Sequence, residues 1–355
     1  MTRLALAGAG SAATVHALAA TVVTGGHISQ VLSRTADSAA ALGVGLNIDH
    51  GTYAELSSRA DGVIIATPAH HHAEMLHEVI GRGLPALVEK PLTTTLAIAD
   101  GIIDAVEVAG VVCGYAENLL FAPCFDVATA HRATLGTLSH LSLRMLSDTP
   151  GWGHFAEALS SQALGGPNTE LPGGGVLHDL GSHPLAMALA LADSDAVSVS
   201  ASMSSSLLGN AAGDRLDDEA TVEITFADGL IATIEVSWRA ETPEWDLQAA
   251  GSDGVIRMEL GPTSSVELDG RDATPALLHP GLADPRIEAF GYVAQLQGFV
   301  DILNRRGGRA CPLGFGRLVL DVTTAAYASA GDGGRSVPLP WSGPRDVTPL
   351  SLWRS

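Results

Sequence analysis

The chain is short of charged residues, and of positive charge in particular. Charged residues make up only 16% of its 355 residues, and 19 Lys and Arg stand against 39 Asp and Glu. The resulting formal net charge of -20 repels nucleic-acid phosphates and anionic lipid surfaces. We therefore expect neither a nucleic acid nor a membrane as a partner.

Cysteine and long apolar runs are scarce as well. The three cysteines, Cys113, Cys124 and Cys311, fit neither a disulfide framework nor a metal-ligand spacing, which predicts free thiols in a reducing cytoplasm. Residues 4–26 carry no formally charged side chain, but glycines and hydroxyl residues interrupt the run, unlike a signal peptide. No other segment is long and apolar enough to span a bilayer. These absences predict a cytoplasmic protein.

Apolar residues are plentiful: the hydrophobic share of 46% is typical of a well-buried globular protein. A chain of this length exceeds one ordinary core, so two domains are expected. The change of pattern along the chain predicts a first domain over residues 1–118, a second over 119–340 and a C-terminal tail over 341–355.

A glycine-rich turn stands near the N-terminus, between an apolar strand at 4–7 and a helix. Gly8-Ala9-Gly10-Ser11-Ala12-Ala13 reads G-x-G-x-x-A, the pattern of a dinucleotide site. The unpaired N–H groups of the helix start would face the phosphates. We assign Gly8, Gly10, Ser11 and Ala12 to the cofactor site. The alternative is a tight turn without a ligand.

The second strand, "HISQVLSRT", ends without the Asp or Glu that an NAD site usually places on the ribose. Ser33 and Arg34 stand there instead. A guanidinium pairs well with the 2′-phosphate of NADP, so NADP(H) is favoured over NAD(H). The alternative for Arg34 is a solvated loop cation. Asp37 is interpreted as a helix-start residue.

Strands at 61–68, 84–91 and 111–118 alternate with helices at 69–83 and 93–110, which predicts a doubly wound parallel sheet. Ligands bind such sheets at the carboxyl ends of the strands. The residues at these ends are Thr67, Pro68, Glu89, Lys90, Glu117 and Asn118.

His70, His71 and His72 invite a metal hypothesis, but adjacent helical residues point about 100° apart and cannot converge on one ion. We expect His72 to face the cleft. Lys90 is more informative, because nearly all the other basic residues are arginines. At a strand end beside a cofactor it could hold a substrate oxygen and lower the pKa of a neighbouring acid. The alternative is a surface lysine.

The pattern after residue 118 is that of an antiparallel layer. Two predicted hairpins turn at 228–229 and 253–254, and one face of the first carries only apolar residues with period two. Helices at 183–191, 286–306 and 314–329 should cover one side of this sheet. The polar side is left either bare or as an oligomer interface.

The stretch "LPGGGVLHDLGSHPL", residues 171–185, lies within this second half. A glycine run lets a helix start approach a flat ligand. Asp179 and His183 follow at i and i+4, where they would lie on one helix face. A carboxylate beside a histidine orients the ring and favours its protonated form, as a proton acceptor requires. The alternatives are a helix cap with a surface histidine, or two metal ligands, although no third ligand stands at a recognisable spacing.

These motifs occur in one order: the glycine turn, "TPAHHHAE", "EKP" and "GGGVLHDLGSHPL". Together they resemble the glucose–fructose oxidoreductase / inositol dehydrogenase family (Gfo/Idh/MocA). The resemblance covers nearly the whole chain, including the pattern around Tyr292, "QGFVDIL" and "AAYASAGDGGRSVPLP".

The resemblance implies an α/β fold: a Rossmann domain that binds NAD or NADP, and a C-terminal α+β domain with an open, mainly antiparallel sheet. It implies that Lys90, Asp179 and His183 are catalytic, that Glu89 lines the nicotinamide pocket, and that His72, which matches the His often found after T-P-x-x-x, belongs to the cofactor site. Substrate contacts are expected from Glu117, Asn118 and Tyr292. The sequence departs from the family at "YAENLLFAP", where many members carry an Arg, so the substrate class does not carry over.

The expected activity is hydride transfer between nicotinamide and a sugar, cyclitol or related polyol. In oxidation, His183 takes the hydroxyl proton and Lys90 stabilises the alkoxide, while Asp179 orients His183 or the substrate. We expect no metal, and a homodimer or homotetramer. The alternative is a dinucleotide-binding sensor without activity, which three intact catalytic residues argue against. A metal-dependent hydrolase or lyase is opposed by the incomplete ligand set.

Overall fold

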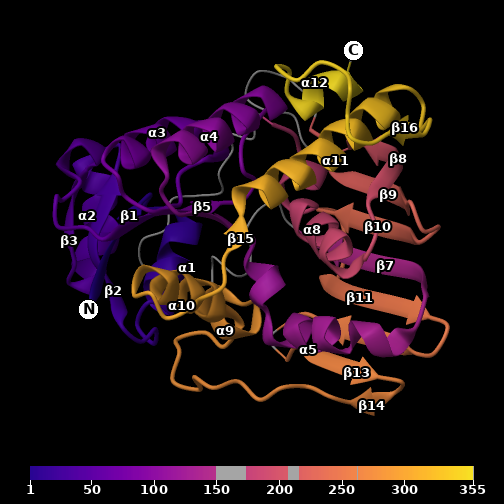
Figure 1. The fold of residues 1–355 in the computed structure, drawn as a ribbon, viewed down its shortest axis with the longest axis horizontal. Coiled ribbons are helices and arrows are strands. Elements are labelled where there is room, and N and C mark those ends of the chain that lie inside the picture. The colour runs from indigo at the N-terminus through magenta and orange to yellow at the C-terminus, as the bar shows by residue number, and fades with distance from the viewer. Residues whose placement is uncertain (149–172, 207–215, 262, 355) are drawn as a thin grey trace.

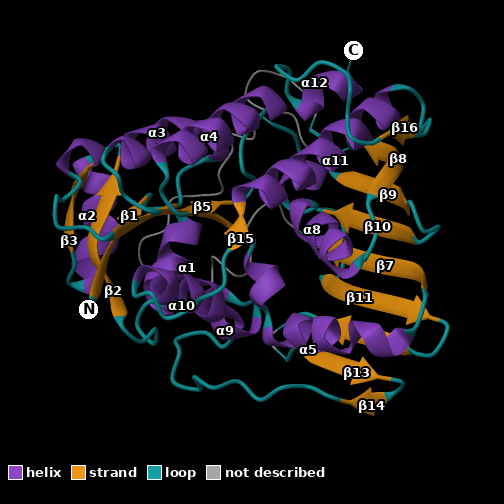
Figure 2. Ribbon diagram, in the orientation of Figure 1, coloured by secondary structure: helices purple, strands orange, loops and turns teal. Residues whose placement is uncertain are grey.

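Two sheets lie side by side in the computed structural model, which describes residues 1–148, 173–206, 216–261 and 263–354. The first sheet has seven strands and the second has nine. Helices cover both faces of the first sheet, whereas those on the second lie on the face toward the first (Figures 1 and 2). The expected division into a parallel and a mainly antiparallel layer is confirmed.

The first sheet has the order β15-β6-β5-β4-β1-β2-β3. Strands β1 to β6 pair with one another in parallel, as expected of a doubly wound sheet. The strands are β1 (Thr2–Ala7), β2 (Gly26–Ser33), β3 (Asp49–Thr52), β4 (Gly62–Ile65), β5 (Ala86–Glu89) and β6 (Cys113–Ala116). The helices between them are α1 (Ser11–Ala19), α2 (Ala36–Leu46), α3 (His72–Gly81) and α4 (Leu96–Ala109), with short 3-10 turns η1 (Tyr53–Glu55) and η2 (Ala69–His71).

Local sequence explains these elements. Strands β4 and β5 are buried along their whole length, which is why they read as continuous apolar runs rather than alternating ones. Helices α2 and α4 begin after Thr35 and Thr95, whose side chains accept from the backbone N–H groups of Ser38 and Ile98. Strand β3 was not predicted, because "DHGT" carries no strand-like pattern.

The second sheet has the order β14-β13-β12-β11-β7-β10-β9-β8-β16. Its strands are β7 (Leu138–Leu146), β8 (Ala196–Ser204), β9 (Glu219–Phe226), β10 (Ile231–Ser237), β11 (Glu244–Gly251), β12 (Val255–Glu259), β13 (Ser265–Leu268), β14 (Arg271–Asp272) and β16 (Val337–Pro338). The pair β7–β10 is parallel and the other pairs are antiparallel. Both predicted hairpins are confirmed, β11–β12 and β9–β10, and the latter turns at Gly229, which lies in the left-handed region at φ 90. Its apolar face, which includes Val222, Ile224 and Phe226, is buried.

The remaining helices are η3 (Asn118–Phe121), α5 (Pro123–His131), η4 (Arg132–Leu135), α7 (Val176–Asp179), α8 (Ser182–Leu191), α9 (Arg286–Ala289), α10 (Tyr292–Leu303), α11 (Leu313–Gly331) and α12 (Pro349–Trp353). The predicted single helix at 286–306 is wrong. Gly291 breaks it into α9 and α10 with φ 86, and a Cβ there would stand 2.2 Å from the carbonyl oxygen of Asn118. Only glycine allows that approach.

The C-terminal half returns to the first sheet. Strand β15 (Cys311–Pro312) pairs antiparallel with β6. Helix α10 also packs on this sheet: a Cβ on Gly26 would meet Val300 at 2.7 Å, and one on Gly62 would meet Leu303 at 2.9 Å. Part of the segment expected in the second domain therefore completes the first layer. None of the helices in the described ranges has the length and hydropathy needed to cross a membrane.

Candidate active site

The polar ends of the parallel strands meet at one edge of the first sheet. The register pairs Ala7 with Ile65, Ile65 with Val88, and Glu89 with Ala116. The segments that follow β1, β4, β5 and β6 therefore begin side by side. This edge holds most of the residues that the sequence assigned to cofactor and substrate.

The turn between β1 and α1 needs its two glycines for different reasons. Gly8 has φ 130, and a Cβ there would stand 2.2 Å from the carbonyl oxygen of Ala66. Gly10 is exposed at the start of α1, and nothing lies within 4 Å of the position that its Cβ would take. Ser11 and Ala12 form the first helical turn and are half-buried. The open space over free N–H groups fits the pyrophosphate of a dinucleotide.

At the end of β2, Ser33 is buried and Arg34 is exposed. Arg34 forms no ion pair with any other residue of the described ranges, so its guanidinium is available to a ligand. Tyr53 interacts with this segment: burial raises the pKa of Tyr53, and a hydrogen bond with Ser33 and the charge of Arg34 oppose that rise.

Lys90, the only lysine of the chain, is paired with Asp179. Its Nζ donates to Asp179 Oδ1 at 2.9 Å and to the Asp179 carbonyl oxygen at 3.2 Å. The two side chains are only 8% and 20% exposed. Burial works against the ammonium, but Asp179, Glu89 and Glu117 hold the pKa of Lys90 above its ordinary value. Burial would raise the pKa of Asp179, but Lys90 holds it below its ordinary value. Both groups are therefore charged at neutral pH.

His183 is bonded to Glu117 and not to Asp179. The distance between His183 Nδ1 and Glu117 Oε1 is 2.5 Å, and both side chains are buried. The prediction that Asp179 and His183 lie on one helix face is wrong, because Asp179 ends α7 and His183 belongs to α8. The carboxylate of Asp179 is directed to Lys90 instead.

A third buried pair joins His16 of α1 to Glu89 at the end of β5. His16 Nε2 lies 2.8 Å from Glu89 Oε1, and the Lys90 backbone N–H donates to Glu89 Oε2 at 3.0 Å. Burial would raise the pKa of Glu89, but His16 and Lys90 hold it below its ordinary value. His16 was not among the predicted site residues. The available signal was a titratable residue inside the apolar first helix.

Three predicted site residues have roles inside the protein. His72 is buried rather than facing a cleft: its Nε2 lies 2.8 Å from the Thr67 carbonyl oxygen and its Nδ1 lies 3.1 Å from that of Leu92. It ties together the loops that carry Pro68 and Lys90. Asn118 donates its amide to the Phe290 carbonyl oxygen at 2.8 Å. Tyr292 is also buried, with its ring edge-to-face against that of His16.

The glycine run has a packing role that the sequence did not indicate. Residues 171 and 172, which precede the three glycines, lie outside the residues that the structure describes. A Cβ on Gly173 would meet the His178 ring at 2.4 Å, and one on Gly175 would meet the Asp217 carbonyl oxygen at 2.1 Å. Asp217 accepts from the backbone N–H groups of Gly175 at 2.7 Å and Leu177 at 2.9 Å, at the start of α7. The glycines let α7 seat against this carboxylate, which places Asp179 at the edge of the first sheet.

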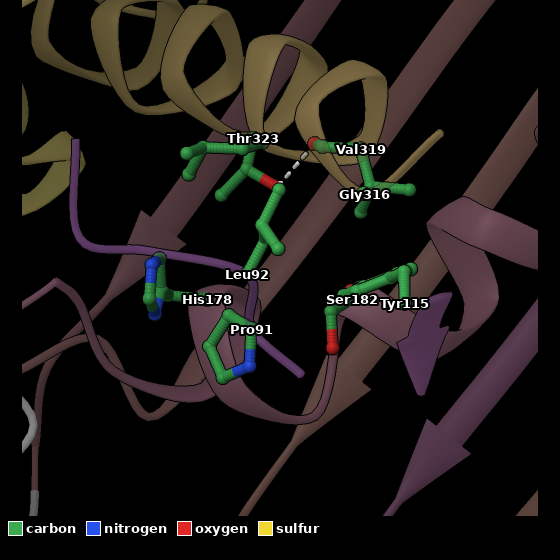
Figure 3. A pocket seen from close by; sticks show the side chains of 9 residues that line it. Pro91, Leu92, Tyr115, His178, Ser182, Gly316, Val319 and Thr323 are labelled. Atoms are coloured by element: carbon green, nitrogen blue, oxygen red, sulfur yellow. Dashed lines mark hydrogen bonds between the residues drawn. The ribbon is translucent and has the colours of Figure 1, made fainter. Parts of the chain in front are cut away.

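A small cavity lies beside the site (Figure 3). Its lining includes Pro91 and Leu92 after β5, His178 of α7, and Thr323 of α11. Burial lowers the pKa of His178 to about 4, so this ring is uncharged at neutral pH. The lining is mainly apolar, which does not suit a polyol. Within the described ranges, no group of three or more His, Cys, Asp or Glu side chains could hold a metal ion.

Comparison with known proteins agrees with this geometry. Residues 2–117 match the oxidoreductase family with an NAD-binding Rossmann fold, and residues 131–257 match the GFO/IDH/MocA C-terminal domain. The chain belongs to the Gfo/Idh/MocA oxidoreductase family. In this Gfo/Idh/MocA protein, the buried Lys90 lies within the part that matches the NAD-binding domain.

Similar proteins act on several compounds. D-apiose dehydrogenase of Paraburkholderia graminis is 26% identical over 303 residues, covering 80% of this chain and 74% of the relative. 1,5-anhydro-D-fructose reductase of Ensifer adhaerens is 26% identical over 271 residues, covering 72% and 75%. The crystal structure of GenD2 from gentamicin A biosynthesis, in complex with NAD, has a TM-score of 0.76 at 25% identity and covers 95% of this chain and 96% of that one.

Proposed function

We propose that this Gfo/Idh/MocA oxidoreductase transfers hydride between NADP(H) and a hydroxyl or keto carbon of a sugar, cyclitol or related polyol. The observation that carries the proposal is the pairing of Lys90 and of His183, each with its own carboxylate, at the carboxyl ends of the strands of a dinucleotide-binding sheet. The names of the relatives, a sugar dehydrogenase and an anhydro-sugar reductase, support the substrate class.

The chain's own groups supply proton transfer and charge. In oxidation, His183 accepts the proton of the substrate hydroxyl. The Lys90 ammonium donates to the same oxygen and stabilises the negative charge that develops as the carbon–hydrogen bond breaks. Asp179 keeps Lys90 charged and fixes its Nζ. The bound dinucleotide supplies a hydride acceptor at nicotinamide C4. In reduction, the protonated His183 returns the proton to the oxygen.

The dinucleotide is held by the turn after β1, where Gly10 leaves room for the pyrophosphate. At the end of β2, Ser33 and Arg34 would bind the 2′-phosphate of its adenosine end. A charge-assisted hydrogen bond contributes about 1.5–3 kcal/mol, which corresponds to roughly 10- to 150-fold in affinity.

Arg34→Ala tests the preference. It should weaken NADPH binding by that factor and leave NADH binding almost unchanged, as measured by quenching of intrinsic fluorescence. Arg59→Ala is the matched control, since Arg59 is exposed and precedes β4, at the other end of the strands. Equal losses for NADPH and NADH would refute the assignment to the 2′-phosphate.

The reaction itself is tested by a dehydrogenase screen of sugars, cyclitols and keto-sugars with both dinucleotides. On the best substrate, His183→Ala should lower turnover by about 10²–10⁴-fold with little change in dinucleotide affinity. Lys90→Met should also lower turnover, and the double variant should lose less than the product of the single losses. Wild-type turnover in the double variant would refute the mechanism. Tight NADPH binding without turnover of any compound would favour the sensor.

A further inference from the structure

We infer that Glu117, and not Asp179, is the positioning residue that fixes the ring of His183 in the tautomer with a free Nε2. The inference deepens the proposed function and rests on it for the role of His183 as the base. It also differs from the substrate contact that the sequence predicted for Glu117.

The hydrogen bond itself determines the tautomer. His183 Nδ1 lies 2.5 Å from Glu117 Oε1, with side chains that are 7% and 0% exposed. An ionised carboxylate can only accept, so the proton must stand on Nδ1. In the neutral ring the lone pair is then on Nε2, and no group in the described ranges forms a hydrogen bond with that atom. Nε2 is the atom left for a substrate proton.

Glu117 is held in place independently of His183. It follows β6 directly, and Ala116 pairs in register with Glu89 of β5. With its amide oxygen turned toward this strand end, the buried Gln295 of α10 accepts from Glu117 N at 3.2 Å and from Asn118 N at 3.1 Å. The backbone that carries the Glu117 carboxylate is thus fixed by two elements, and His183 packs against that carboxylate.

The other charged groups around His183 have hydrogen-bond partners of their own, although the His183 charge also contributes to the lowered pKa of Asp179. Asp179 and Lys90 form their own pair, and Glu89 is bonded to His16. His178 of α7 has its pKa lowered to about 4 by burial and carries no charge at neutral pH. Glu117 is therefore the carboxylate that directly faces the positive charge which His183 gains on taking a proton. This arrangement separates two tasks: Asp179 serves Lys90, and Glu117 serves His183.

The tautomer can be measured without a substrate. The full-length protein, labelled with ¹⁵N-histidine and saturated with NADPH, should show one ring with a protonated Nδ1, a free Nε2 and a strongly downfield Nδ1 proton. His183→Asn identifies this ring among the 13 histidines by the loss of its signals. A wild-type His183 protonated on Nε2 and free on Nδ1 would overturn the inference.

Variants then separate the two carboxylates. Glu117→Met, which lacks an acceptor, should abolish the downfield signal and mix the tautomers, Glu117→Asp should restore it in part, and Asp179→Asn should leave it unchanged. The reverse result, with Asp179→Asn disturbing His183 and Glu117→Met leaving it intact, would refute the inference. The wild-type spectrum decides even where a variant fails to fold.

Turnover supplies a second readout. Glu117→Gln keeps an acceptor but removes the charge, so the protonated His183 loses its direct partner. Turnover in oxidation should then fall, and the midpoint of its rise with pH should move to lower pH. A purely structural role would lower turnover without moving this midpoint, and that outcome would refute the inference. If neither the wild type nor any variant turns over a substrate, but the spectra show the expected His183 tautomer, the proposed function fails and the role of Glu117 in positioning His183 stands.

Discussion

Replacing Asp179 by Asn tests how much the buried Lys90 pair matters to the fold. The Nζ–Oδ1 distance is 2.9 Å, and the two side chains are 8% and 20% exposed. Removing one partner of a buried ion pair costs about 3–5 kcal/mol, because the other charge stays buried without compensation. Since Asp179 is partly open to solvent, we expect the lower end, about 3 kcal/mol.

An exposed pair of similar length provides the control. Arg309 and Asp126 are 2.8 Å apart, but their side chains are 56% and 44% exposed. Asp126→Asn should therefore cost less than about 1 kcal/mol. Urea denaturation of the three proteins at pH 7 measures both free energies of unfolding.

The reactivity of the Lys90 amine gives a second measure of its pairing with Asp179. Because it is the only lysine, acetic anhydride has only its amine and the N-terminal amine of the chain to modify. In the wild type, the carboxylates hold the pKa of Lys90 above its ordinary value and keep the amine protonated and slow to react. Acetylation of Lys90 relative to Met1, measured by mass spectrometry at pH 9, should be faster in Asp179→Asn.

The pH dependence has a definite sign. The lowered pKa of Asp179 gives stability that is complete above the ordinary value of 3.8 and is lost as pH falls through the folded value. The raised pKa of Lys90 gives stability that is complete below 10.5 and is lost as pH rises through the folded value. The gap between wild type and Asp179→Asn should be largest between these limits. Equal losses in Asp179→Asn and Asp126→Asn, with unchanged acetylation, would refute the reasoning.

Two further predictions concern glycine geometry and the seat of α7. Gly10→Val should abolish NADPH binding but keep a urea midpoint near that of the wild type, because its side chain enters open space. Gly8→Ala should lower the free energy of unfolding by about 1–3 kcal/mol, because its Cβ clashes with Ala66. Normal NADPH binding in Gly10→Val would place the cofactor elsewhere. Tyr327→Phe should lose about 1.5–3 kcal/mol, since the Tyr327 hydroxyl donates to the buried Asp217 at 2.5 Å, and an unchanged urea midpoint would contradict that role.

Local patterns predicted the parts of this protein that depend on neighbours in sequence. The strand–turn–helix around Gly8 and Gly10 occupies one short segment, so its spacing alone indicated the fold and the ligand class. The hairpin at 228–229 was found for the same reason, from period-two burial and an Asp-Gly turn.

The partners within the site could not be found in this way. Lys90 and Asp179 are 89 residues apart, and Glu117 and His183 are 66 apart. The four-residue spacing of Asp179 and His183 predicted that their side chains would pair on one helix face. The break between α7 and α8 prevents this pairing. Strand β15, a Cys-Pro dipeptide, carries no pattern and exists because β6 offers an open edge. Contacts of this kind are set by the packing of the two layers.

The return of the C-terminal half to the first sheet bears on how the protein is made. A ribosome would release residues 1–118 long before it synthesises α10, which packs against β2 and β4, and β15, which pairs with β6. Until then, the edge of β6 and the α10-facing side of the sheet have no cover, and both are surfaces that associate with other chains. The first sheet and its helical cover therefore stay incomplete until residues 292–312 have been synthesised.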